Sequence, residues 1–210
     1  VIGRQFSYEL LQAASQVDEA MLQHELGRLV EAEIVYQRGL SPQATYTFKH
    51  ALIQDAAYHS LLRRTRQQAH QRIAQVLAER FVEIAATQPE LLAYHYTEAG
   101  LLEQAIPYWQ RAGQRALQRS ANVEAITHLT RGLEALTTLP NNPERAQHEL
   151  VLQTTLGPAL MATKGRAAPE VGQTYTRTRE LCQQVGETSH LFQVLWGLWG
   201  FYNVRAEHET

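Results

Sequence analysis

The sequence predicts a mainly α-helical protein that begins with a small module carrying one β-hairpin and continues as antiparallel helix pairs. β-prone runs occur only before residue 50, whereas apolar residues recur at helical spacing from residue 63 onward. Short segments with proline or glycine separate the later helical stretches, which favours antiparallel neighbours. The chain has 210 residues, 44% of them hydrophobic, which allows one large folded unit or two small ones.

Residues 1–62 have the outline of a winged-helix-like module. We expect, in order, helices over 6–14 and 19–33, strands over 34–38 and 45–49, and a third helix from residue 51. Asp18 is a suitable N-cap for the second helix, and Gly39-Leu40-Ser41-Pro42 is typical of a turn between strands. The apolar residues of the third helix are Leu52, Ile53, Ala56, Ala57 and Leu61.

Residues 63–85 read as one connecting helix, and residues 86–210 as helical repeats similar to tetratricopeptide (TPR) repeats. Thr87 and Glu90 have capping-box spacing for a new helix, and further helices are expected over 102–119, 123–139, 144–164, 169–185 and from 189. One repeat has TPR-like spacing of small and large residues: Leu92, Ala93, Tyr96, Gly100, Ala105, Trp109 and Ala112. The pattern is degenerate, so an irregular helical bundle remains the alternative.

The last helix has almost no polar face. Its apolar residues are Leu191, Phe192, Val194, Leu195, Trp196, Leu198, Trp199, Phe201 and Tyr202. A water-exposed helix of this kind needs cover on both sides. We therefore expect dimerisation through this helix or an inward fold of its surface. The apolar stretch is shorter than the roughly 20 residues that cross a bilayer, so no membrane segment is predicted.

No residue pattern predicts catalysis, cofactor binding or a metal site. The chain has neither a phosphate-binding glycine loop nor a His-Glu-x-x-His motif. The histidines, among them His50, His59, His70, His95 and His128, are scattered over different helices and are expected to be packed or solvated residues, not ligands. Cys182 is expected to be a core residue. We therefore expect no enzymatic activity in this chain.

Arg111, Arg115 and Arg119 recur every four residues and form a cationic stripe on one helix face. The stripe is a candidate groove for an acidic protein partner, because guanidinium groups pair well with carboxylates. A merely solvated face is the alternative. Nucleic acid is disfavoured as a partner, because the net charge is −2 and the second helix is rich in carboxylates.

The segment Tyr46-Thr47-Phe48-Lys49-His50-Ala51-Leu52-Ile53-Gln54-Asp55-Ala56-Ala57-Tyr58-His59-Ser60-Leu61 resembles the region that follows the ATPase core in bacterial STAND-type signalling proteins. In particular, it resembles those that join an adenylate/guanylate cyclase domain, an AAA-like ATPase and a TPR tail. The segments 1–6, 95–100 and 105–113 are similar to the start of the winged helix and to the first repeat of that tail. No catalytic residue of the family can be placed on this chain.

This resemblance implies a cytoplasmic, non-catalytic regulatory arm whose partners are another protein or neighbouring domains of a longer polypeptide. The chain would then be a piece of that polypeptide, with the nucleotide-binding domains upstream. The alternative is part of a transcription regulator, in which the winged helix contacts DNA and the helical repeats sense a ligand.

Overall fold

A computed structural model describes residues 1–189 and 191–206. It is mainly helical, with one small antiparallel sheet, as the sequence predicts. Residues 190 and 207–210, which belong to the predicted repeat region 86–210, lie outside the described part. The elements are β1 (Gln5–Ser7), α1 (Tyr8–Ala14), α2 (Glu19–Glu31), β2 (Val35–Arg38), β3 (Thr45–Phe48), α3 (Ala51–Ser60), α4 (Arg63–Arg80), α5 (Val82–Thr87), α6 (Pro89–Ala99), α7 (Leu102–Gln118), α8 (Asn122–Thr137), α9 (Pro143–Lys164), α10 (Pro169–Val185) and α11 (Leu191–Ala206).

The chain forms two compact units. Unit 1 comprises residues 1–87 and 94–101, and unit 2 comprises residues 88–93 and the chain from 102 onward. Helix α6 contributes its first residues to unit 2 and the rest to unit 1. The two units are described separately below.

The sheet of unit 1 has the strand order β1-β3-β2, with both pairings antiparallel. Phe6 lies opposite Tyr46, and Tyr36 opposite Thr47. The prediction of a helix from residue 6 was wrong, because residues 5–7 pair with β3. Helix α1 begins only after Ser7, whose side chain accepts a hydrogen bond from the Leu10 N–H. A small core lies between the sheet and the first two helices: Tyr8, Leu22, Leu26, Val35, Ala44 and Tyr46.

Helix α2 has the N-cap that its sequence predicts. The Asp18 carboxylate accepts a hydrogen bond from the Ala20 N–H at 3.1 Å. The helix ends at Glu31, two residues earlier than expected. Glu33 adopts a left-handed φ of 56°, and the Ile34 N–H donates back to the Leu29 carbonyl, so this turn closes the helix.

The expected single helix over 63–85 is interrupted. Helix α4 ends at Arg80, and Phe81, with φ −115° and ψ 51°, separates it from the short α5. The expected capping box does not form, because Thr87 is the last residue of α5. Its hydroxyl donates to the Glu83 carbonyl at 2.7 Å, one turn back in the same helix.

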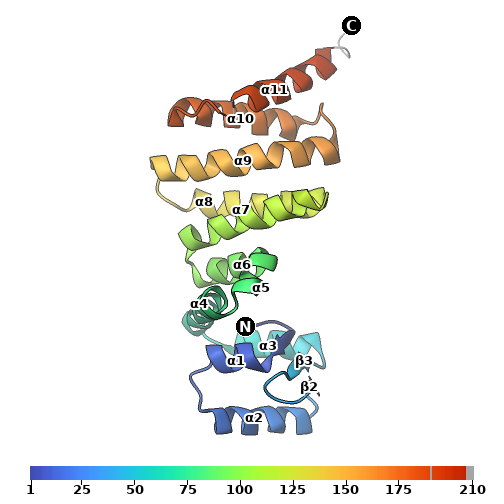
Figure 1. Cartoon of the computed structure of the whole chain (residues 1–210), viewed down its shortest axis with the longest axis vertical. Coiled ribbons are helices and arrows are strands. Elements are labelled where there is room, and N and C mark those ends of the chain that lie inside the picture. The colour runs from blue at the N-terminus through green and yellow to red at the C-terminus, as the bar shows by residue number, and fades with distance from the viewer. Residues whose placement is uncertain (190, 207–210) are drawn as a thin grey trace. The chain divides into compact units, whose positions relative to one another are not determined.

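In unit 2, helices α7 to α11 pack one after another in chain order (Figure 1). At each of the four steps, a glycine of one helix lies against a large side chain of the next: Gly113 with Leu129, Gly132 with Leu152, Gly157 with Tyr175, and Gly172 with Phe201. A Cβ atom at Gly157 would lie only 2.6 Å from the Tyr175 Cζ atom. The missing side chain therefore lets each helix approach its neighbour closely.

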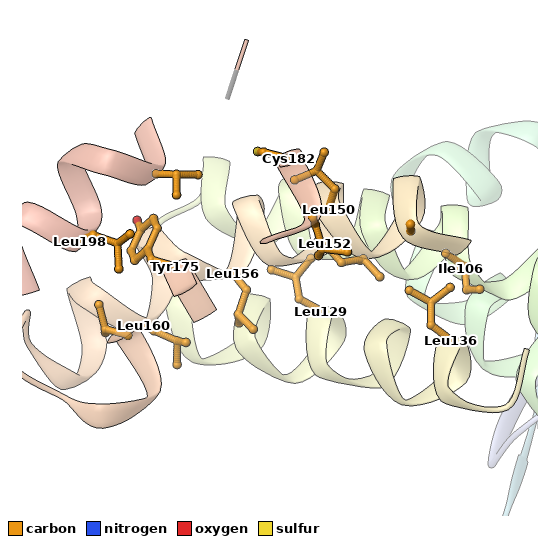
Figure 2. Packing of buried hydrophobic residues seen from close by; sticks show 14 of the residues in the cluster. Ile106, Leu129, Leu136, Leu150, Leu152, Leu156, Leu160, Tyr175, Cys182 and Leu198 are labelled. Carbon is orange, nitrogen blue, oxygen red and sulfur yellow. The ribbon is translucent and has the colours of Figure 1, made fainter. Parts of the chain in front are cut away.

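The core of unit 2 runs along this stack as one cluster. Figure 2 shows leucines from neighbouring helices, such as Leu129, Leu152 and Leu156, pointing toward one another. Tyr175 is 1% exposed, and burial raises the pKa of its hydroxyl to about 12. Cys182 is buried in the same cluster, as predicted, and burial raises the pKa of its thiol. No helix of the described residues has the length and apolar character needed to span a membrane.

Candidate functional site

Helix α11 presents two different apolar faces. One face packs into the unit 2 core through Val194, Leu198 and Phe201, which recur at helical spacing. The opposite face, here called the α11 face, is exposed to solvent. Its residues and exposed fractions are Phe192 (79%), Leu195 (54%), Trp196 (54%), Trp199 (54%) and Tyr202 (59%).

The inward fold that the sequence left open is not observed for this surface. Trp196 and Trp199 lie side by side, with ring centroids 5.1 Å apart, and both remain half exposed. Aromatic side chains gathered on one exposed face are typical of protein interaction surfaces. The α11 face is therefore the leading candidate for contact with another protein.

A shallow groove of about 460 Å³ adjoins the α11 face between α10 and α11. Arg177 lines it and is engaged internally, because its Nε and Nη2 atoms donate to the two Glu149 carboxylate oxygens at 2.7 and 3.0 Å. This paired geometry holds the pKa of Arg177 above its ordinary value. Arg205 lies over the Phe201 ring and has no carboxylate partner among the described residues. The groove thus places one available cation beside the exposed aromatic residues.

A second apolar surface lies on α3 in unit 1. The sequence marks Leu52, Ile53, Ala56, Ala57 and Leu61 as its apolar residues, yet α3 buries none of its residues. Leu52 is 80% exposed, and Leu62, which follows the helix, is 78% exposed. The α3 helix is held instead by Tyr58, which is half-buried.

The predicted arginine stripe lies on α7, but its members are partly engaged within unit 2. Arg111 lies over the Tyr108 ring, with 5.4 Å from its guanidinium carbon to the ring centroid. Arg119 forms a salt bridge with Glu124 at 3.0 Å, and Arg115 also has an interaction partner. Glu124 is shared with His128, whose Nε2 atom lies 3.5 Å from it. The salt bridge of Arg119 with Glu124 reduces the positive charge that the stripe can offer to a partner.

Unit 1 also contains a chain of hydrogen bonds that the sequence did not predict. His70 of α4 and His95 of α6 are 0% and 1% exposed, and their Nδ1 atoms lie 2.8 Å apart. The Tyr58 hydroxyl lies 3.1 Å from the His70 Nε2 atom and donates to Glu98 Oε2 at 3.3 Å. His70 and His95 are packed residues on different helices, as expected, but the sequence did not predict their contact. No local signal could have revealed it, because the two residues lie 25 positions apart on different helices.

Burial decides the protonation of this pair. It lowers the pKa of His70 to about 4 and that of His95 to about 3. Nearby positive charges lower both values further: the Val1 amino group and Arg66 act on His70, and His70 and the Val1 amino group act on His95. Burial also raises the pKa of the Tyr58 hydroxyl. The groups are thus neutral near pH 7, and their hydrogen bonds join α3, α4 and the second half of α6. Among the described residues, no three His, Cys, Asp or Glu side chains gather in a way that could hold a metal ion.

The chain is similar along most of its length to part of a longer bacterial protein. No protein-family model matches the chain, and no solved structure matches it. An uncharacterized protein of Rhizobium meliloti (strain 1021) is 28% identical over 202 residues, which is 95% of this chain and 20% of that protein. The chain therefore spans about a fifth of the length of this relative.

Proposed function

We propose that this chain is a non-catalytic regulatory and protein-interaction arm of a larger multidomain signalling protein. The observation that carries the proposal is the α11 face, whose five large apolar side chains are each at least 54% exposed. A surface of this kind is costly in water unless a partner covers it. The similarity to one fifth of a much longer protein supports a role within a larger assembly.

Unit 1 fits the winged-helix-like part of this arm. Helices α1 and α2 lie in the sequence between β1 and the β2–β3 hairpin, and β3 pairs with β1. This order of elements is typical of winged-helix modules. The uncovered apolar surface of α3 is then a contact site for a neighbouring domain of the parent protein.

Unit 2 fits the TPR-like part. Its consecutive helices meet through the repeated pairing of a glycine with a large residue, which is how helical repeats pack closely. Each such helix covers the previous one, and the α11 face is left exposed for a partner. The partner we propose is an apolar helical surface, with a carboxylate positioned to pair with Arg205 at the groove.

The resemblance to STAND-type proteins supplies the signalling context of this proposal. In that context, the ATPase and nucleotide-cyclase activities belong to other parts of the polypeptide, and the compartment is the cytoplasm. Binding of a partner to the arm would favour one packing state of the whole protein over another, as in other two-state switches.

A DNA-reading role is less well supported by the charges of unit 1. Helix α2 and its ends carry Glu19, Glu25, Glu31 and Asp18, and its single arginine, Arg28, already pairs with Glu25 at 3.2 Å. These carboxylates would be repelled by phosphates. A salt-dependent mobility shift with random duplex DNA would favour the transcription-regulator alternative instead.

The α11 face can be tested by sedimentation velocity of the purified chain. We expect self-association at about 100 µM, because an uncovered apolar face finds a second copy when its natural partner is missing. The double variant Trp196→Glu/Trp199→Glu should be monomeric with unchanged helix content, since both residues are half exposed. The matched control Gln193→Glu/Asn203→Glu places the same charges on exposed polar positions of α11 and should associate like the original chain.

Two outcomes would contradict the proposal. One is a monomeric original chain at this concentration, because it would show that the exposed α11 face does not need a partner to cover it. The other is ATP hydrolysis or cyclic-nucleotide formation by the purified chain, which would contradict its non-catalytic role.

A further inference from the structure

Unit 1 contains a partly open apolar cavity of about 270 Å³. Its walls come from three parts of unit 1: Phe6 and Phe48 of the sheet, Leu11 and Ala14 of α1, and Ala69 and Ile73 of α4. The Phe6 and Phe48 rings tilt toward each other, with centroids 6.1 Å apart. The volume lies just below the usual range for sites that hold drug-sized molecules, so it suits a small ligand.

Arg72 is the charged side chain that lines this cavity, and most of its hydrogen-bond donors are unused. It is half-buried, and the hydrogen bond that it donates, from Nη1 to the Ala14 carbonyl, is long at 3.5 Å. Within residues 1–189 and 191–206, no carboxylate forms an ion pair with it. A guanidinium carries five N–H donors, so most of its hydrogen-bonding capacity remains free. Ser15 adds a hydroxyl to the lining.

We propose that this cavity binds a small monocarboxylate with an apolar body, such as a medium-chain fatty acid or an aryl carboxylic acid. The carboxylate pairs with Arg72, and the apolar body packs against Phe6, Phe48 and Ile73. A neutral apolar ligand would desolvate Arg72 without neutralising it, and a polyanion such as a nucleotide would find one cationic side chain and apolar walls. One charge beside an apolar space therefore selects an amphiphilic monoanion.

Titration calorimetry of the full chain with sodium octanoate tests the proposal, with 1-octanol and acetate as matched probes. The chain is used with its amino terminus acetylated, because Val1 also lines the cavity and its amino group would add a second charge. We expect saturable binding of octanoate, weaker binding of octanol, and no binding of acetate. Methyl NMR shifts of Ile2, Leu11 and Ile73 should change on addition of octanoate and locate the ligand.

Three variants make the test specific. Arg72→Gln should weaken octanoate binding about tenfold or more, while octanol binding changes little. The matched variant Arg64→Gln removes an exposed arginine of the same helix and should leave octanoate binding unchanged. Ala69→Phe fills the cavity and should abolish binding of both octanoate and octanol.

Three results would overturn the proposal. They are the absence of octanoate binding to the original chain, equal octanoate affinity in the original and Arg72→Gln chains, and unchanged binding in a folded Ala69→Phe chain. Circular dichroism of each variant establishes that it is folded.

Discussion

The imidazole rings of His70 and His95 meet through their Nδ1 atoms at 2.8 Å, and both side chains are excluded from solvent. One Nδ1 must donate and the other accept, so the accepting ring must be neutral. Burial lowers the pKa of both rings, to about 4 and about 3, from about 6.5 in an unfolded chain. The unfolded state therefore binds these two protons before the folded state does.

The first prediction is a loss of stability in mild acid. Well above pH 6.5 both rings are neutral in both states, so the pair adds no pH dependence there. Between about pH 6.5 and pH 5, each ring should lower the free energy of unfolding by about 2 kcal/mol, and the loss should level off below the folded pKa values. Urea unfolding at about pH 7, 6 and 5 measures how the free energy of unfolding changes with pH.

Histidine NMR resonances provide an independent measurement of the same pair. The ring signals of His70 and His95 should stay at their neutral positions at pH 5.5 in the folded chain, because both folded pKa values lie lower. A midpoint above pH 6 for either ring would contradict the prediction. The His95→Gln variant removes one titrating ring. The change in the free energy of unfolding with pH should therefore fall by about half.

The second prediction concerns the hydroxyl that completes this chain of hydrogen bonds. Tyr58→Phe leaves the buried His70 Nε2 atom without its partner and removes the link to Glu98. We expect the free energy of unfolding to fall by about 1–3 kcal/mol. Tyr202→Phe, at an exposed position of α11, is the control and should change it by less than about 0.5 kcal/mol. Equal effects of the two substitutions would show that the Tyr58 contacts do not stabilise the fold.

The third prediction tests the close contact between α9 and α10. Gly157→Ala places a methyl group 2.6 Å from the Tyr175 ring, which is buried and cannot move freely. Overpacking of this kind costs about 1–3 kcal/mol, despite the better helix propensity of alanine. Thermal or urea unfolding measures the loss.

Gly200→Ala is the matched control for this contact. A Cβ atom at Gly200 meets only the flexible Arg166 side chain, at 3.7 Å or more. Alanine there should stabilise the helix by about 0.5–1 kcal/mol, since it restricts the unfolded chain. If both substitutions stabilise the protein, the glycine contacts between the helices are not tight.

The fourth prediction concerns the end of α7. Ser120 has a left-handed φ of 58°, and the Ala121 N–H donates to the Ala116 carbonyl at 2.9 Å across this turn. Because glycine adopts this conformation without steric cost, Ser120→Gly should raise the free energy of unfolding by about 0.5–1 kcal/mol. Ser120→Val should lower it, because a β-branched side chain tolerates this φ poorly. If urea unfolding gives Ser120→Val a higher free energy of unfolding than Ser120→Gly, the left-handed conformation of residue 120 is contradicted.

Local sequence signals predicted most of the helices and the hairpin. Asp18 caps α2, and glycines with positive φ end α6, α9 and α10 where the apolar periodicity stops. These signals act within one turn of the chain, so they can be recognised without a structure. The missed features depend on distant partners: residues 5–7 form a strand only because residues 45–47 pair with them.

The sequence by itself determined a mainly helical chain with one hairpin, because residue periodicity and helix-end residues act locally. Tertiary structure alone decided which apolar surfaces stay uncovered, because that depends on which helices become neighbours. It left α3 without a buried residue and exposed one face of α11. It also brought His70 to His95 and Arg72 to the cavity, through contacts between elements that no local pattern relates.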